Sequence, residues 1–246
     1  MTIRLHMLGA VSALTFFASP ALSAVEMFDN AVTLSPTQAA GAWYTDRYAP
    51  NGFVSPVVFD GDNRLKQTIS SADLQASEFY NTQGRKYDVN TTSASIQLYV
   101  PQAWSTTNAR MASFWATGNG SDPIYPIIEF NQGGFRVWDS GNGWVNLAGA
   151  VNYDSWYSLS FAINGSNVDY KVGNLSASVD AYGATSLVNV MLQGHNTQGV
   201  ASYDIYWDNL STPAAVPEPA TWALMIGGLA LVGASMRRRK TTVAFA

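Results

Sequence analysis

The middle of the chain alternates polar and apolar residues with a period of two. Residues 95–100 read Ser-Ile-Gln-Leu-Tyr-Val, and six further runs share this pattern and are rich in Val, Ile and aromatic residues. Because successive side chains of a strand point to opposite faces, the pattern predicts strands that each bury one face. The six further runs are 124–130, 134–138, 156–163, 168–172, 187–192 and 203–207.

Turn residues separate these runs at short intervals. Gly, Asn, Asp and Ser cluster between them, and Asn164-Gly165 predicts a hairpin turn between the runs 156–163 and 168–172. The middle of the chain has no apolar stripe of four helical turns, although residues 70–80 have room for one short helix. Many short strands joined by turns are typical of an all-β sandwich.

The first 24 residues have the three parts of a secretory signal. Arg4 supplies a basic start, residues 7–18 are apolar, and small residues lead up to Ala24. The apolar run is too short to span a bilayer comfortably, because a span needs about 20 residues. We therefore expect cleavage after Ser23 or Ala24, and a buried N-terminal helix is the alternative.

A Pro-Glu-Pro triplet, an uncharged segment over 220–236 and a basic cluster follow one another at the C-terminus. At ~1.5 Å per residue the uncharged segment extends roughly 25 Å as a helix, which is short of the ~30 Å hydrocarbon core. The basic cluster predicts that the tail stays cytoplasmic at first and that the preceding residues lie outside. An ordinary single-span anchor is one interpretation, but the marginal length favours a temporary hold in the membrane. The triplet is Pro217, Glu218 and Pro219, and the cluster is Arg237, Arg238, Arg239 and Lys240.

The string VPEPATWALMIGGLALVGASMRRRK resembles the PEP-CTERM sorting signal of Gram-negative bacteria. Proteins with this signal are handled by an exosortase, a membrane-embedded transpeptidase, in organisms that make exopolysaccharide. The resemblance implies that Pro217, Glu218 and Pro219 are the recognition element and that the helix is removed or exchanged. It also implies export across the inner membrane, a final place at the cell surface or outside it, and a transient membrane contact.

Two segments of the middle region resemble concanavalin A-like (LamG-like) jelly rolls. Residues 154–172 follow a Trp-x-x-Leu strand, a turn and a Tyr-x-Val strand, and residues 202–210 are similar to the closing strand of those domains. Residues 64–69 resemble an early strand, and residues 83–87 a loop, of the same exported family. The resemblance implies an all-β jelly-roll sandwich for the exported domain.

Together these features predict five consecutive parts of the chain. The sandwich is followed by a Pro/Ala-rich stretch that begins at residue 211 and predicts an extended linker. The parts are a signal peptide over 1–24, the sandwich over 25–211, a linker with the Pro-Glu-Pro motif over 212–219, a transmembrane helix with its arginine cluster over 220–240, and a tail over 241–246.

Charge and cysteine usage exclude two classes of function. Only 12% of the residues are charged, and between positions 25 and 216 we count 8 Lys and Arg against 16 Asp and Glu, a net charge of −8. Such a surface repels a polyanion, so a nucleic-acid partner is not expected. The chain has no cysteine, which excludes disulfides and thiolate metal sites.

The carboxylates of the exported domain do not follow the usual pattern of a glycoside hydrolase. Hydrolases on this fold resemble one another in a Glu-x-Asp-x-x-Glu motif or a close variant, whereas Glu129 is followed by no second carboxylate until Asp139. His195 is the one histidine that remains after signal removal, and its Gln-Gly-His-Asn setting predicts a solvated loop residue. We therefore expect no catalysis and no required cofactor.

A calcium site is the candidate for metal binding. Asp60, Asp62 and Asn63 place oxygen ligands within one turn, and Asp208 in the last predicted strand is a second candidate. The alternative for the turn is a solvated Asp/Asn loop without metal, which the turn preferences of these residues favour.

Tryptophans give the strongest signal for binding, because sugars stack on flat aromatic rings. Trp156 and Trp207 fall within strand patterns and are predicted in the core, whereas the others considered lie next to Gly/Asn/Asp-rich loops. The predicted ligand-binding set is Trp115, Trp138 and Trp144, with Glu129, Arg136 and Asp139 as hydrogen-bonding partners. The leading hypothesis is a non-catalytic surface protein that associates with a glycan or exopolysaccharide. The alternatives are a diverged glycoside hydrolase or polysaccharide lyase, and a structural matrix protein that binds other proteins.

Overall fold

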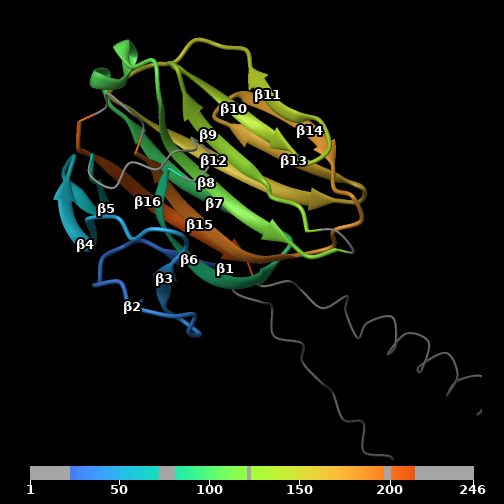
Figure 1. The fold of residues 1–246 in the computed structure, drawn as a ribbon, viewed down its shortest axis with the longest axis horizontal. Coiled ribbons are helices and arrows are strands. Elements are labelled where there is room, and N and C mark those ends of the chain that lie inside the picture. The colour runs from blue at the N-terminus through green and yellow to red at the C-terminus, as the bar shows by residue number, and fades with distance from the viewer. Residues whose placement is uncertain (1–22, 72–80, 121–122, 197–200, 214–246) are drawn as a thin grey trace, which may run out of the picture. The chain divides into compact units, whose positions relative to one another are not determined.

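The computed structural model describes residues 23–71, 81–120, 123–196 and 201–213, all within one compact unit that spans 22–215 (Figure 1). The predicted sorting tag, nearly all of the signal peptide and most of the predicted short helix over 70–80 lie outside the described residues. Within the described part of the chain, no helix has the length and apolar character needed to cross a membrane.

Two eight-stranded sheets form the unit, and we call them sheet A and sheet B. Sheet A contains β1 (Ser23–Glu26), β4 (Gly52–Phe59), β5 (Asp62–Ile69), β7 (Ser93–Val100), β12 (Ser155–Asn164), β13 (Asn167–Val172), β14 (Leu175–Asp180) and β16 (Tyr203–Pro213). Sheet B contains β2 (Leu34–Ser35), β3 (Trp43–Thr45), β6 (Thr82–Thr91), β8 (Arg110–Gly118), β9 (Ile127–Asn131), β10 (Gly134–Asp139), β11 (Gly143–Leu147) and β15 (Leu187–His195). One short 3₁₀ helix, η2 (Gln102–Thr106), leads from β7 toward β8.

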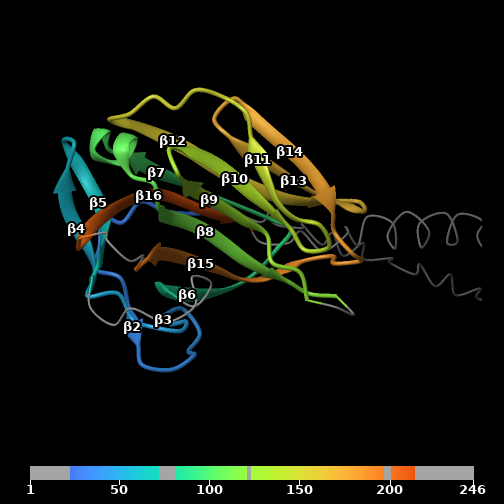
Figure 2. The same ribbon diagram turned by 45° about the horizontal axis from the view of Figure 1, so that its top comes forward.

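The strand order explains why residues far apart in sequence share a face. Sheet A runs β14-β13-β12-β7-β16-β5-β4 with β1 on β16, and sheet B runs β11-β10-β9-β8-β15-β6-β3-β2. Among the described strands, every neighbouring pair is antiparallel except β2 with β3. Figure 2 shows β12, β7 and β16 in one layer and β8, β15 and β6 in the other. The predicted all-β sandwich is confirmed.

All seven predicted runs lie in or overlap strands, with small shifts at their ends. The run 124–130 shortens because β9 begins after Pro126, which lacks the N–H that a ladder position needs. The hairpin between β12 and β13 pairs Asn164 with Asn167, so its turn is Gly165-Ser166, one residue later than predicted. Gly165 takes a φ of 62°, a conformation that glycine adopts without steric cost.

Two predicted loops are strands. Residues 83–87, predicted as a loop, lie inside β6, and Gly84 permits the close approach of β15, since a Cβ there would meet the Leu192 carbonyl oxygen at 2.5 Å. Residues 211–213, predicted as the start of the linker, extend β16 and pair with β1, with Pro213 opposite Ser23. In both places backbone pairing with a distant segment overrides a loop-like composition.

The inward faces of the two sheets make one apolar core. Phe114 of sheet B stacks on Phe161 of sheet A with ring centroids 4.5 Å apart, and Trp207 is fully buried as predicted. Trp156 was predicted in the core but lies partly exposed on the outer face of sheet A. Leu159 and Phe161 of the same strand point inward, so the even-numbered positions of β12 point outward.

Candidate binding face on sheet B

The outer face of sheet B carries two rows of side chains that run across its strands. Strand register aligns β10, β9, β8 and β15, and positions two apart on each strand share a face. The polar row consists of Arg136, Glu129, Ser113 and Gln193, and the apolar row consists of Trp144, Trp138, Ile127, Trp115 and Met191.

Glu129 is the centre of the polar row and is completely buried. Arg136 donates to Oε1 through Nε at 2.8 Å and through Nη2. Arg110 donates to Oε2 through Nε at 3.0 Å and through Nη2 at 2.7 Å. His195 Nε2 lies 3.1 Å from the same Oε2. Each carboxylate oxygen therefore accepts two hydrogen bonds from one guanidinium, and charge-assisted hydrogen bonds are stronger than neutral ones.

The surroundings of Glu129 set the protonation state of the cluster. Burial alone would raise the pKa of Glu129, but the contact with His195 and the charge and hydrogen bonds of Arg110 outweigh it and hold the pKa well below its usual value. Burial and the positive charge of Arg110 lower the pKa of His195 to about 4. At neutral pH the cluster thus contains an ionised Glu129 and a neutral His195 that donates through Nε2–H.

Ser113 links the polar row to the apolar row. Its Oγ accepts a hydrogen bond from Trp115 Nε1 and lies 3.0 Å from His195 Nε2. All three side chains are buried, with Trp115 only 2% exposed. Arg47 lies over the Trp115 ring at 5.5 Å from its centroid. Trp115 therefore holds the cluster together from within and presents no open ring surface.

Trp138 and Trp144 form the accessible end of the apolar row. Both rings are partly exposed, and they meet edge to face with centroids 5.0 Å apart and planes at 70°. The Arg136 guanidinium lies 3.9 Å from the centroid of the Trp144 ring. This end of the face combines flat apolar surface with a fixed donor group, which suits a ligand that has both C–H faces and hydroxyls.

Asp139 does not join this face. It follows Phe135 and Val137 on the inward side of β10, and its carboxylate accepts hydrogen bonds from the Gly141 and Asn142 backbone and from the Tyr182 hydroxyl. Burial would raise the pKa of Asp139, but these hydrogen bonds and that of the Asn142 side chain keep it low. The prediction that Asp139 partners Glu129 and Arg136 is wrong, because Asp139 lies three positions from Arg136 and an odd offset on a strand places two side chains on opposite faces.

Three members of the cluster were missed from sequence. His195, predicted as a solvated loop residue, is the last residue of β15 and is completely buried. Arg110 and Ser113 lie on β8, whose partner β9 brings Glu129 opposite Ser113. The sequence contains one relevant signal: Ser113 and Trp115 are two residues apart, which places both on one face of a strand. It contains no local signal that pairs this strand with the strand of Glu129.

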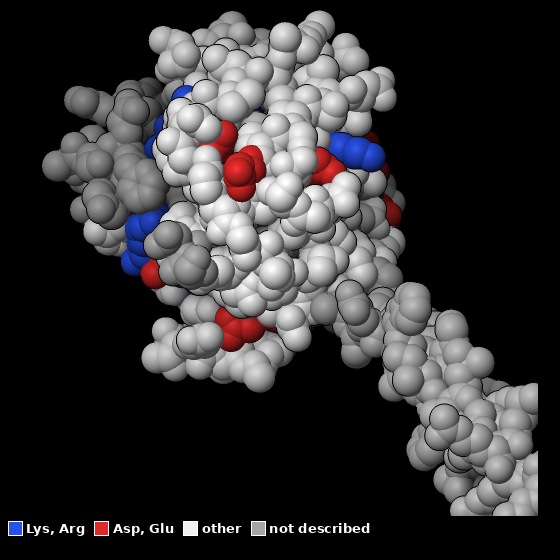
Figure 3. All heavy atoms as spheres, turned by 90° about the vertical axis from the view of Figure 1, so that its right-hand side faces the viewer, with Lys and Arg blue, Asp and Glu red and all other residues white. Residues whose placement is uncertain are grey.

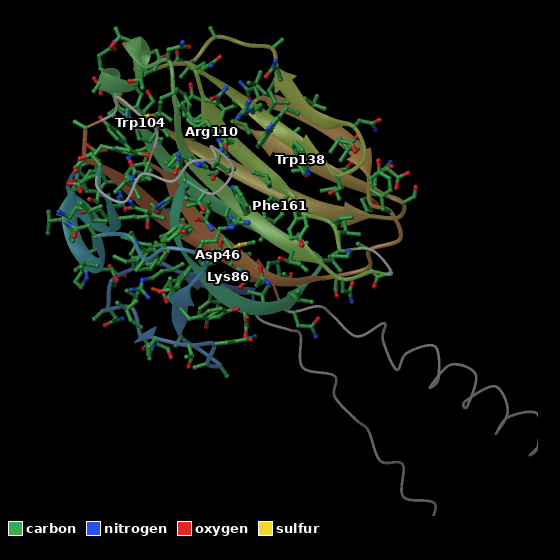
Figure 4. The ribbon with its side chains drawn as sticks, viewed as in Figure 1. Asp46, Lys86, Trp104, Arg110, Trp138 and Phe161 are labelled. Carbon is green, nitrogen blue, oxygen red and sulfur yellow. The ribbon has the colours of Figure 1, made fainter. Side chains whose placement is uncertain are left out.

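A second ionic group lies further along the same sheet. Asp46 contacts Lys86 Nζ at 2.7 Å and Arg47 Nη1 at 3.3 Å, and it accepts a hydrogen bond from Gln193 at 2.8 Å. Figure 4 shows Asp46 and Lys86 side by side, with Arg110 higher on the sheet. Gln193 therefore connects this group to the polar row.

The positions around Glu129 on this face are not acidic. Arg136 and Ser113 lie opposite it on the neighbouring strands, and Ile127 and Asn131 are two residues away along β9. A glycosidase needs two carboxyl groups about 5–10 Å apart, one of which is protonated at working pH. The described neighbours of Glu129 supply no second carboxyl group, and Glu129 itself is held in the ionised form.

The predicted calcium ligands already have protein partners. Asp62 and Asp208 both bind Arg64, Asn63 donates to Asp29 at 3.0 Å, and Asp60 accepts from Trp156 Nε1 at 3.1 Å. Burial raises the pKa of the Asp208 carboxyl. No group of three His, Cys, Asp or Glu among the described residues is arranged to hold a metal ion. Calcium binding at these residues stays a prediction.

Two facing antiparallel sheets with this strand order define a concanavalin A-like jelly roll, and solved structures share the architecture. Bacillus licheniformis β-glucanase has a TM-score of 0.51 and 13% identity over 78% of this chain and 97% of its own. An apo Crh5 transglycosylase has a TM-score of 0.52 and 10% identity over 79% of this chain and 85% of its own. A sialidase matches at 0.51 with 11% identity, and this chain spans only 19% of its length. At such identities the likeness establishes the fold.

The C-terminal residues 215–240 match the PEP-CTERM protein-sorting motif. The chain is therefore a jelly-roll protein that carries a PEP-CTERM sorting signal, which implies export and exosortase processing. No curated protein matches the chain by sequence.

Proposed function

We propose that this protein is an exported, non-catalytic glycan-binding protein whose accessible apolar row, Trp138 and Trp144, binds an exopolysaccharide. One observation carries the proposal. The two indoles meet on the outer face of sheet B beside Arg136. The neighbouring Glu129 forms ion pairs with both Arg136 and Arg110. The face thus offers stacking and hydrogen bonding without a free acid.

Sugar recognition needs the two kinds of contact that this end of the row supplies. A pyranose ring places its C–H face on an aromatic ring, and its hydroxyls take hydrogen bonds from fixed polar groups. Arg136 is held in place by Glu129 at 2.8 Å and stacked on Trp144, so its position is set before a ligand arrives. A preset donor reduces the entropy lost on binding.

The enzymatic alternative has one argument in its favour. Bacillus licheniformis β-glucanase and the Crh5 transglycosylase, whose names denote glycan-active enzymes, share the fold, and Glu129 stands on the outer face of a central strand. A catalytic acid must be protonated near working pH, whereas two arginines favour the ionised form of Glu129. The charge state and the non-acidic neighbours of Glu129 favour binding over hydrolysis.

The sorting signal suggests where the binding takes place. We propose that an exosortase processes the Pro-Glu-Pro tag of a Gram-negative producer and that the domain then remains in the surface matrix. The membrane contact of the tag is transient in this proposal, because its uncharged segment is marginal for a permanent span. The glycan that the domain meets there is the producer's own exopolysaccharide.

Retention of the full chain, purified in mild detergent, on immobilised exopolysaccharide of the producer tests the proposal. We expect the wild type to be retained. The Trp138→Ala/Trp144→Ala variant is expected to bind at least about tenfold more weakly and therefore to elute earlier. Val145→Ala is the matched control, since Val145 directly follows Trp144 on β11 and points to the other face. Retention on matrix proteins alone would favour the structural alternative, and no retention on any glycan or matrix extract would refute both.

A further inference from the structure

Four aromatic side chains form a patch on the outer face of sheet A, on the side of the sandwich opposite the face described above. Phe59 stacks on Tyr206 with centroids 3.7 Å apart, Phe59 meets Tyr99 edge-on at 4.9 Å, and Tyr99 lies 5.5 Å from Trp156. All four rings are partly exposed. We call these four residues the aromatic patch.

The aromatic patch has no role in the core. Tyr99 lies between Leu98 and Val100, and Tyr206 lies between Ile205 and Trp207, and in each case the neighbours point inward and are buried. The patch therefore adds little to folding while it exposes connected ring surface across β4, β16, β7 and β12. Connected apolar surface that is exposed to solvent in this way is typical of an interaction site. Figure 3, which views another side of the molecule, shows mostly uncharged surface with isolated charged groups.

Polar groups at the rim of the patch distinguish it. The Arg64 guanidinium lies 4.8 Å from the centroid of the Trp156 ring, and Asp60 accepts a hydrogen bond from the indole N–H at 3.1 Å. Asp154 accepts from the Tyr99 hydroxyl at 3.2 Å. Carboxylates and a guanidinium beside exposed rings supply acceptors and donors for hydroxyl groups.

A groove continues from the patch along sheet A. A hollow of about 380 Å³ borders Trp156, and a second of about 620 Å³ lies further along the same strands. Both volumes are in the range of ligand sites. The two hollows share Ser158, and the second is lined by Ser93, Ser95 and Ser160 together with the oppositely charged Asp169 and Lys171. Aromatic rings at one end and a run of small hydroxyl side chains beyond them form an open path along β12 and β7.

We propose that the aromatic patch and this serine-lined groove form a second saccharide-binding surface, specific for a neutral polysaccharide chain. The rim contains Asp60, Asp62 and Asp154, while Arg64 is already bound to Asp62 and Asp208. An acidic polymer is repelled by these carboxylates. A second copy of this chain is disfavoured for the same reason, because a two-fold contact across the patch brings the same carboxylates of both copies together.

If sheet B also binds a glycan, the second surface allows the protein to cross-link two polysaccharide chains. Only this cross-linking rests on the proposed function. The two surfaces lie on opposite sheets, so one molecule can hold two polysaccharide chains at once. Tyr206 of the aromatic patch and Pro213, the last described residue, are seven residues apart on β16. At ~3.3 Å per residue this is about 23 Å, so the patch lies away from the end of the chain that leads to the sorting signal. A cross-linker of this kind gains avidity from holding both chains.

Affinity electrophoresis of the full chain in mild detergent tests the second surface, with mixed-linkage β-glucan, xylan and galactomannan as neutral probes and alginate as the acidic probe. We expect at least one neutral probe to retard the wild type, and Trp156→Ala and Tyr206→Ala to weaken that retardation at least about tenfold, which corresponds to ~1.4 kcal/mol. Trp156→Phe keeps a ring and retains most of the effect. Val58→Ala, at a position 78% exposed beside Phe59, is the control and leaves retardation unchanged.

The outcomes separate the two surfaces. If the second surface binds independently of sheet B, the Trp138→Ala/Trp144→Ala variant is retarded by the neutral probes as much as the wild type. This holds whether or not the double substitution weakens exopolysaccharide binding. Unchanged circular dichroism in the near ultraviolet shows that each variant is folded. Equal retardation of the wild type and a folded Trp156→Ala variant would overturn the proposal, and so would a wild type that no neutral probe retards.

Discussion

The outer faces of the two sheets use similar residues in opposite ways. Each combines arginine, carboxylate and tryptophan, but on sheet B the Glu129 side chain is 0% exposed, whereas on sheet A Arg64 binds both the buried Asp208 and Asp62, whose side chain is 57% exposed. Ion pairs out of water are costly to break, and ion pairs in water contribute little. The comparison indicates that burial makes the sheet B cluster a structural element, while exposure leaves the sheet A patch free to meet a ligand.

The largest effect is expected from removing the central carboxylate of sheet B. Glu129→Ala leaves Arg110 and Arg136 without their shared partner in a buried site, so the free energy of unfolding falls by about 3–5 kcal/mol. On sheet A, Lys66→Ala breaks a 3.5 Å contact with Asp204 between groups that are 33% and 36% exposed, and it costs at most about 1 kcal/mol. Thermal unfolding of both variants measures the difference. Equal losses would contradict the assignment of a structural role to Glu129.

Two of the tryptophans that meet arginines, Trp115 on sheet B and Trp156 on sheet A, sharpen the comparison. Trp115 is 2% exposed, so Trp115→Ala leaves a cavity and costs about 3–5 kcal/mol of unfolding free energy. Trp156 is partly exposed, and Trp156→Ala removes a hydrogen bond to Asp60 and the ring contacts with Tyr99 and Arg64, which together cost about 1–2 kcal/mol. Denaturant titrations of the two variants test this order. The account fails if Trp156→Ala is the more damaging change.

Acid should weaken the fold through the sheet B cluster. His195 has a pKa of about 4 in the folded protein and 6.5 as a model value, so between these values the unfolded chain binds more protons and stability falls as the pH falls. At ~1.4 kcal/mol per unit the loss is about 3 kcal/mol across this window. The lowered pKa of Glu129 acts in the same direction below its model value of 4.5.

His195→Gln isolates the histidine contribution, because glutamine does not titrate and its amide can still donate to Glu129. Unfolding temperatures measured from pH 7 to pH 4 are expected to fall less steeply for the variant than for the wild type. Parallel curves for the two proteins would show that His195 does not carry the pH dependence.

The smallest effect is expected from removing divalent cations. Arg64 already binds Asp62 and Asp208, so the oxygen atoms that a calcium ion needs are compensated by a protein cation. EDTA is therefore expected to leave the unfolding temperature unchanged, since a ligand that does not bind the folded state cannot stabilise it. If EDTA lowers the unfolding temperature and added calcium reverses the change, the result would support a calcium site at Asp60, Asp62, Asn63 and Asp208.

The sequence predicted the local features of this molecule better than the contacts between distant strands. Alternation located the strands and placed Trp138 and Arg136 where they share a face, because period two is a local property. The same alternation did not reveal that Trp156 points outward, since a strand pattern alone does not say which face is buried. Arg110, Ser113 and His195 meet Glu129 through the order of three strands, β9, β8 and β15, and no local pattern records that order.

The central claim is that Glu129 is structural and that the face around it binds a glycan without cleaving it. Incubating the full chain with the producer's exopolysaccharide, while measuring both retention and newly formed reducing ends, tests it most directly. We predict retention that depends on Trp138 and Trp144, with no increase in reducing ends at any pH from 4 to 8. Reducing ends that accumulate with the wild type and disappear with a folded Glu129→Gln variant would contradict the claim.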